Sequence, residues 1–265
     1  MKLTLVKLAV AAGLCAQITL GEELTKIEDV LKFSMDKSES YQSFAADVTQ
    51  TMNVMGSPMN LTGHMEFKRP ALMRYDVAMQ AMGQSQTVVS VMGGDRVVWQ
   101  EMSIGPMKQV IKMDFTKIPS NSPAGNPFDK MDPKQQWRAA QEKYDFKLSG
   151  TGDLHGQRMY IVTGTPKASA TWTPQETMVG INTASDRVQI GQQDGFMHKM
   201  EMIDKSGTNV LMSMDFTNLK FNVDIPESRF IYKPAPDAQI MDMTSTLLQM
   251  SAPTPPPATA PQKQK

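Results

Sequence analysis

The chain has 265 residues, and its 27 Lys and Arg are balanced by 27 Asp and Glu, so the formal net charge is zero. This balance argues against nucleic-acid binding, because proteins that bind nucleic acids usually carry a basic face. An apolar share of 40% suffices for one hydrophobic core and is not the composition of a membrane protein, and the length suits a single domain with appendages.

Methionine is unusually frequent, with 24 residues in a chain that is only 7% aromatic. Its flexible, polarizable side chain is over-used on surfaces that accept apolar partners of variable shape. Drift of Leu and Ile to Met would also raise the count, because such exchanges cost little in a core. Composition alone leaves both explanations open.

The N-terminus predicts a cleaved signal peptide over residues 1–21 and hence export to the periplasm. Lys2 and Lys7 give the positive start, and residues 8–14 form an apolar run far shorter than the about 20 residues of a membrane span. Cys15, the only cysteine, follows a leucine rather than a small residue, which disfavours lipid attachment at this position.

The mature domain is expected to cover residues 22–250, with a helix at each of two places. Apolar residues recur at helical spacing in residues 22–40, where Thr25 and Glu28 offer a capping box; this helix is either an ordinary surface helix or a movable lid. A second helix is expected within residues 128–144. The following residues 251–265 are rich in Pro, Ala, Thr and Gln and predict a disordered tail.

Much of the remaining chain alternates apolar and polar residues with a period of two, which is typical of an antiparallel sheet with one apolar face. The expected strands cover residues 44–52, 61–68, 73–79, 86–92, 96–102, 145–149, 159–163, 178–182, 187–191, 197–203, 210–216, 218–223 and 229–232. Residues 103–127 and 165–177 read as loops. This distribution predicts one α+β domain rather than βαβ units.

Patterns that indicate catalysis are weak. The three histidines, His64, His155 and His198, lack a nucleophile or carboxylate at a recognisable spacing, and neither a phosphate loop nor a zinc spacing occurs. We therefore expect no enzyme activity and no cofactor.

Cu(I) binding is the sharpest alternative function. His198, Met200 and Met202 alternate along one strand, Met212 and Met214 form a second pair, and soft thioether ligands suit Cu(I). A half-buried hairpin requires the same spacing, however, so these residues equally fit a purely apolar role.

Several short motifs follow one another along the chain. They are residues 41–50, a first strand; 63–75, a hairpin with Lys-Arg-Pro; 94–99, a turn that ends in Trp; 204–207 with 216–219, a late hairpin; and 225–226 with 230–234, a closing segment. In this order, over residues 22–243, they resemble the motifs of the LolA family of lipoprotein carriers.

The resemblance implies a curved, incomplete antiparallel β-barrel, with an N-terminal helix and further short helices as a lid over an apolar cavity. It implies a periplasmic protein that ferries the acyl chains of lipoproteins from inner to outer membrane, with an inner-membrane lipoprotein release transporter and an outer-membrane acceptor as partners. The family also includes outer-membrane acceptors and sensor domains, and a glycolipid is an alternative cargo. The fold does not choose among these roles.

The apolar strand faces supply the residues expected to line an acyl cavity. They are Phe44, Val48, Met65, Phe67, Met73, Tyr75, Val77, Met79, Trp99, Met200, Met202, Met212, Met214 and Phe216. A lining rich in methionine would adapt to variable chains.

Arg69 occupies the position that, by the resemblance, latches the helical lid. It shares the odd register with Met65 and Phe67 and should point to the apolar face, whereas Arg74 should point outward. If Pro70 breaks the register, Arg69 is a rim residue instead.

Overall fold

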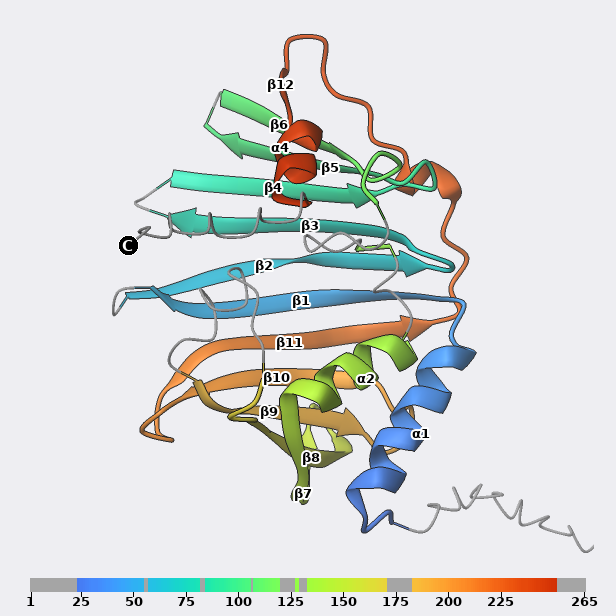
Figure 1. The fold of residues 1–265 in the computed structure, drawn as a ribbon, viewed down its shortest axis with the longest axis vertical. Coiled ribbons are helices and arrows are strands. Elements are labelled where there is room, and N and C mark those ends of the chain that lie inside the picture. The colour runs from blue at the N-terminus through green and yellow to red at the C-terminus, as the bar shows by residue number, and fades with distance from the viewer. Residues whose placement is uncertain are drawn as a thin grey trace, which may run out of the picture.

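The computed structural model describes residues 23–54, 57–81, 84–105, 107–119, 127–128, 133–170 and 183–251, and its strands form one sheet (Figure 1). The strands are β1 Ser43–Val54, β2 Ser57–Lys68, β3 Leu72–Ala81, β4 Gln84–Met92, β5 Val97–Ile104, β6 Met107–Asp114, β7 Tyr144–Leu154, β8 Gln157–Pro166, β9 Thr183–Gly191, β10 Met197–Asp204, β11 Val210–Phe221 and β12 Gln239–Asp242. The described helices are α1 Ile27–Ser40, α2 Pro133–Lys143, the 3-10 helix η2 Glu227–Phe230 and α4 Thr244–Ser251. In this part of the chain, no helix is both long enough and apolar enough to cross a membrane.

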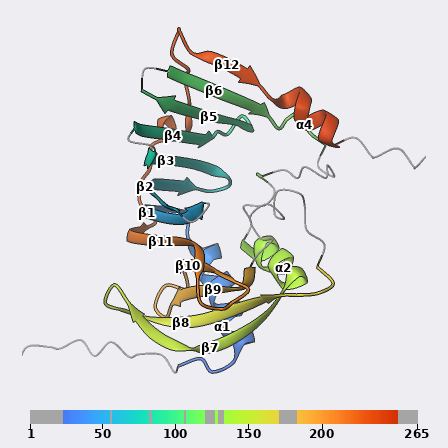
Figure 2. The same ribbon diagram turned by 90° about the vertical axis from the view of Figure 1, so that its left-hand side faces the viewer.

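The sheet is curved and open. Its strand order is β12-β6-β5-β4-β3-β2-β1-β11-β10-β9-β8-β7, and the two terminal strands do not pair with each other. Seen edge-on, it forms a C with α2 and α4 on the concave side and the connection from β11 to β12 along the convex side (Figure 2). Neighbouring strands are antiparallel, except that β12 is parallel to β6. The expected α+β fold, an incomplete barrel with an N-terminal helix, is confirmed.

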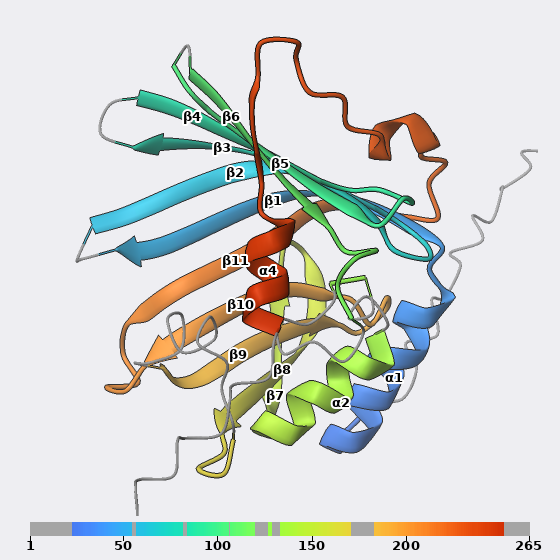
Figure 3. The same ribbon diagram turned by 45° about the horizontal axis from the view of Figure 1, so that its top comes forward.

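Helices α1 and α2 lie side by side at the β7–β10 end of the sheet (Figure 3), whereas α4 contacts β6 near the opposite end (Figure 2). Val30 of α1 is completely buried against a cluster that includes Val162 and Ile190, and Trp137 of α2 packs on the same cluster. The centroid of the Trp137 ring is 5.6 Å from that of Phe146. Burial of these apolar stripes, rather than helix propensity, fixes both helices on the sheet.

Helix α1 begins later than the sequence suggests. Its N-cap is Lys26, which makes no side-chain capping bond, so the capping box expected from Thr25 and Glu28 is wrong. The acidic residues Glu28 and Asp29 lie in the first turn, where they favour the positive end of the helix dipole.

The sheet margin differs most from expectation. Residues expected as a loop form β6, and β12 and α4 were not expected at all. Residues 229–232, expected as a strand, belong instead to η2 and the extended chain after it. We name residues 222–238 the convex strap, since they cross the convex face before β12 joins the sheet edge (Figure 2).

Several expectations fall outside the described residues. These are the signal peptide with Cys15, the expected strand over 178–182 and the tail from residue 252 onward. Ser251, which we placed in the tail, ends α4 instead.

Candidate functional site: a methionine-lined concave face

The strand registers bring apolar residues from widely separated parts of the chain onto the concave face. One cross-strand row runs through Met202, Met212, Met52 and Met59. A second runs through Phe216, Val48, Gly63, Val77 and Val88. Because opposing side chains in such rows lie about 5 Å apart, each row forms a continuous apolar band.

All but one of the residues expected to bind an acyl chain share this face. They are Phe44, Val48, Met65, Phe67, Met73, Tyr75, Val77, Met79, Met200, Met202, Met212, Met214 and Phe216. Their common face is an observation, whereas their role in binding stays a prediction.

Trp99 is the exception. It lies opposite Val91, which lies opposite Arg74, so all three are on the convex face. Its ring centroid is 5.4 Å from that of Tyr232 in the convex strap. In β5 the even-numbered residues, such as Met102, point to the concave face, because β3 pairs its odd-numbered residues with even-numbered residues of β4, and β4 pairs these with even-numbered residues of β5. The expectation that Trp99 faces the apolar cavity is therefore wrong.

Methionine is concentrated on the concave face. The methionines that register or packing places there are Met52, Met59, Met65, Met73, Met79, Met92, Met102, Met107, Met113, Met197, Met200, Met202, Met212 and Met214, more than half of the 24 in the chain. Large apolar positions on the convex face of the same strands carry Leu72, Val89, Val91, Val97, Trp99, Val110 and Ile203. Register places Met159 of β8 on the convex face, but most methionines that can be assigned to a face lie on the concave one. Drift to methionine would affect both faces alike, so this uneven distribution favours a functional role.

Among the residues that the structure describes, the protein's own core covers only part of the concave face. Val48, Val77 and Phe216 are buried in small clusters, but Met65 and Met79 at the edges of those clusters are only half-buried. Such partly covered side chains leave apolar area available to a ligand.

Arg69, in the turn between β2 and β3, reaches the C-terminal end of α1. Its Nε donates to the backbone oxygen of Tyr41 at 2.8 Å, and Nη2 donates to that of Ser38 at 3.0 Å. Carbonyls in the last turn of a helix lack partners within the helix and carry the negative end of its dipole. The guanidinium therefore ties β2–β3 to α1, which is the geometry that a latch requires.

Arg74 lies on the convex face, as expected, but does not face open solvent. Its Nε donates to Asp76 Oδ2 at 2.8 Å, and Nη1 donates to the backbone oxygen of Arg229 at 3.3 Å. The convex strap therefore covers this side chain, which is 20% exposed.

A second set of bonds holds α1 at the loop between β9 and β10. Ser34 Oγ donates to the backbone oxygen of Gly195 at 2.7 Å, and Tyr41 Oη donates to that of Asp194. Burial, with the nearby Asp194 carboxylate, raises the pKa of Tyr41 to about 12. Asp194 in turn lies 2.9 Å from Nε2 of the buried His198.

This pairing bears on the copper alternative. His198 Nε2 already has a carboxylate partner, and a register shift between Met197 and Lys199 interrupts the alternation that would align His198 with Met200. His64 and His155 likewise lie within 3 Å of Asp47 and Asp215. Across the described ranges, no three His, Cys, Asp or Glu side chains lie close enough to hold a metal ion.

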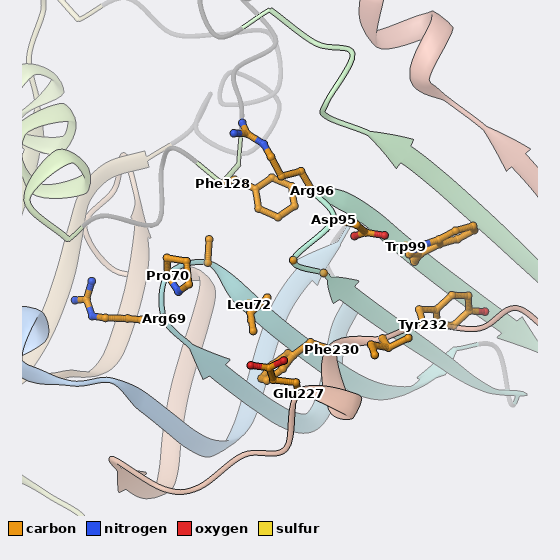
Figure 4. Close-up of a pocket in the computed structure, with 14 residues that line it drawn as sticks. Arg69, Pro70, Leu72, Asp95, Arg96, Trp99, Phe128, Glu227, Phe230 and Tyr232 are labelled. Atoms are coloured by element: carbon orange, nitrogen blue, oxygen red, sulfur yellow. The ribbon is translucent and has the colours of Figure 1, made fainter.

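A cavity of about 790 Å³ lies at the end of the sheet where Arg69 is found (Figure 4). Leu72, Trp99 and Phe230 contribute apolar walls, and Asp95 and Glu227 contribute carboxylates. The Arg69 side chain points away from these residues and toward α1. This cavity lies between the hairpin turns and the convex strap, so it is separate from the methionine-lined face.

Sequence reasoning missed Asp186, the one carboxylate in the cross-strand row of Met202 and Met212. The expected strands over 178–182 and 187–191 left Asp186 between them. Its alternation with Val188 and Ile190, two apolar residues of β9, was the signal that could have placed it on the concave face.

Comparison with known proteins identifies a fold rather than a family. No family model matches the chain. An uncharacterized protein, MJ0687 of Methanocaldococcus jannaschii, is 22% identical over 214 residues, covering 81% of this chain and 53% of that protein. The chain thus spans about half the length of the curated relative it matches.

Solved structures are similar at low sequence identity. An uncharacterized conserved protein from Thermus thermophilus has a TM-score of 0.50 at 14% identity, covering 81% of this chain and 98% of that one. The lipoprotein LppX of Mycobacterium tuberculosis has a TM-score of 0.45 at 14% identity, covering 76% and 98%. The likeness to the Thermus protein shows a shared fold, and the function is argued below from the concave face.

Proposed function

We propose that the protein is a periplasmic carrier that binds the acyl chains of lipoproteins on its concave face and ferries them from the inner to the outer membrane. The observation that carries this proposal is the concentration of methionine on the concave face of a curved, open sheet. The signal peptide expected over residues 1–21 supports export, and the resemblance to the LolA family supports the class of cargo.

The energetics of acyl chains suit such a surface. Burial of an acyl chain releases about 0.8 kcal/mol per CH₂, so a lipidated protein needs an apolar cover to cross water. Methionine side chains have three rotatable bonds and can repack around chains of different length and number. Half-buried side chains such as Met65 and Met214 offer contact area without a fixed shape.

Helix α1 is the proposed lid. It covers the β8–β10 end of the concave side and is held there by Arg69. Opening of this contact would enlarge the apolar face for loading, and closing it would favour release. An inner-membrane lipoprotein release transporter and an outer-membrane acceptor are the partners that this cycle requires.

A lipoprotein-sensing protein or a glycolipid carrier of the same fold would use the same face. Cu(I) binding has less support, because His198 is already paired with Asp194. We propose no catalytic role and no cofactor for the concave face.

Binding of a fluorescent fatty-acid probe in metal-free buffer tests the proposal. Wild type should bind the probe, and joint replacement of Met202→Gln and Met212→Gln should weaken binding about tenfold or more, since polar amides would replace two opposing thioethers. Ile231→Gln is the control, because Ile231 is 59% exposed in the convex strap, on the opposite side of the sheet. Failure to bind any acylated probe, together with tight Cu(I) binding lost on His198→Ala, would favour the copper alternative.

A further inference from the structure

One ionisable residue interrupts an otherwise apolar row on the concave face. From β7 to β2 the row contains Phe146, Gly164, Asp186, Met202, Met212, Met52 and Met59. Asp186 thus has a glycine on one side and a methionine on the other. A carboxylate at this position is costly unless something binds it.

The structure satisfies only part of the hydrogen-bonding capacity of Asp186. Burial raises the pKa of Asp186, and a side-chain hydrogen bond from Tyr144 opposes that shift. Its Oδ1 is buried and has no hydrogen-bond partner among the residues that the structure describes. One oxygen remains as an acceptor without a donor.

The surroundings hold the pair in place. The Tyr144 ring stacks on Phe146 with centroids 5.9 Å apart. Gly164 makes room for both rings, because a Cβ at this position would lie 2.8 Å from the Phe146 ring. Phe146 also packs edge-on against Trp137 of α2. Tyr144 therefore helps to hold Asp186 as a fixed polar group within an apolar row rather than as a mobile surface group.

We propose that Asp186, positioned by Tyr144, is a polar anchor on the acyl-binding face and binds a hydroxyl or ammonium group adjacent to an acyl chain. This inference rests on the proposed function and specifies its ligand class. An ionised carboxylate only accepts hydrogen bonds, so its partner must be a donor. Anionic head groups, such as a free fatty-acid carboxylate or a phosphate, would be repelled. The anchor selects amphiphiles with a neutral, hydroxyl-bearing or cationic polar end.

Four probes with one oleyl chain each separate these chemistries: monooleoylglycerol offers hydroxyls, oleylamine an ammonium, methyl oleate no donor and oleate an anion. Wild type should bind the glycerol ester, the amine or both at least about tenfold more tightly than methyl oleate, and oleate least tightly. A preference for only one of the two donors identifies the ammonium or the hydroxyl as the group recognised.

Three variants and a control locate the effect. Asp186→Leu should abolish the preference for donors while leaving methyl oleate binding unchanged. Asp186→Asn keeps an acceptor oxygen, so it should retain hydroxyl binding and lose any preference for ammonium. Tyr144→Phe should reduce the preference without removing it. Asp145→Asn is the matched control, since this neighbouring carboxylate is 77% exposed and should not matter.

Two outcomes would overturn the inference in different ways. If all four probes bind wild type and Asp186→Leu with the same order of affinity, Asp186 is not an anchor, although the proposed function stands. If no probe binds wild type, including methyl oleate, the proposed function fails and the anchor fails with it.

Discussion

Replacement of Arg69 by leucine tests the proposed lid most directly. The variant keeps an apolar body and deletes both donors to α1, at 2.8 Å to Tyr41 and 3.0 Å to Ser38. Charge-assisted hydrogen bonds are worth about 1.5–3 kcal/mol. We take this range for the two bonds together, because Arg69 is only half-buried and water replaces part of the interaction.

The closed state should lose that much stability relative to the open state. Apparent cargo affinity scales with the open fraction, so Arg69→Leu should bind acylated cargo roughly 10- to 100-fold more tightly than wild type, up to the intrinsic affinity of the open face. Release should slow correspondingly. Binding of a lipoprotein and its transfer to acceptor membranes, measured side by side, check both expectations.

The control must be an arginine whose side chain bonds neither to α1 nor to the convex strap; Arg158 meets this condition, since among the residues that the structure describes it bonds only to Thr151 and Asp153 within its own hairpin. Arg74 is unsuitable, since it is covered by the convex strap and bonded to Asp76 and Arg229. Arg158 is 46% exposed on the β7–β8 hairpin, and Arg158→Leu should change neither binding nor transfer. Weaker binding by Arg69→Leu, or an equal transfer defect in both variants, would refute the latch and leave Arg69 as a structural contact.

Asp186→Asn should raise the free energy of unfolding at neutral pH, because burial raises the pKa of Asp186 and makes its ionised form costly in the folded state. The difference from wild type should shrink as the pH falls, since the wild-type folded state gains stability when Asp186 binds a proton. Denaturant titrations at several pH values measure this difference, and a constant or widening difference at lower pH would contradict the prediction. Asp204→Ala should loosen the β10–β11 turn at neutral pH, because Asp204 accepts hydrogen bonds from Ser206 and Asn209. Hydrogen exchange of the amides in this turn should therefore become faster. The same hydrogen bonds hold the pKa of Asp204 well below its usual range, so the wild-type amides should lose their protection from exchange only in strong acid. Deletion of residues 252–265 should leave the melting temperature unchanged, because burial of its few apolar residues could not offset the conformational entropy lost on ordering. A melting temperature lower by several degrees would mean that this segment packs on the folded domain. N-terminal sequencing of the exported protein should find a start near Glu22, and an acylated Cys15 would contradict the cleaved signal peptide.

Alternation along each strand was enough to predict which residues share the concave face within one strand. It failed between strands, because the number of residues in each turn sets the parity of the next strand. Met65 and Tyr75 were placed correctly since β2 and β3 both direct odd-numbered residues inward. Trp99 was misplaced because β5 directs even-numbered residues inward.

The sheet margin could not be predicted from local pattern. A four-residue parallel strand such as β12 carries no periodic signal, and its place beside β6 depends on contacts across the chain. Lys112 interacts with Asp242 across this pair, and Asp114 donates its backbone N–H to Thr244 Oγ1. The convex strap is irregular for the same reason, as its position is set by bonds such as that from Arg229 to Glu66. Strand parity predicted only that Arg69 faces the apolar side, and its contact with the helix was implied by the family resemblance alone; the structure shows its bonds to Tyr41 and Ser38.

The convex strap supports the curvature of the sheet from the side opposite the proposed ligand-binding face. Tyr232 donates a hydrogen bond to Glu101 in β5, and Arg229 donates one to Glu66 in β2, so the strap supports the β2–β5 region from the convex side. At the other end of the sheet, α1 supports β8 and β9 from the concave side, where Val30 packs against Val162 and Ile190. The bonds that support the curvature near β2–β5 therefore lie on the convex side and do not involve the methionine side chains of the concave face. In the proposed lid cycle, by contrast, α1 would have to leave the β8–β9 end before a ligand could bind there. If α1 is the lid, the binding surface near β2–β5 is constant, and the surface near β8–β9 depends on the position of α1.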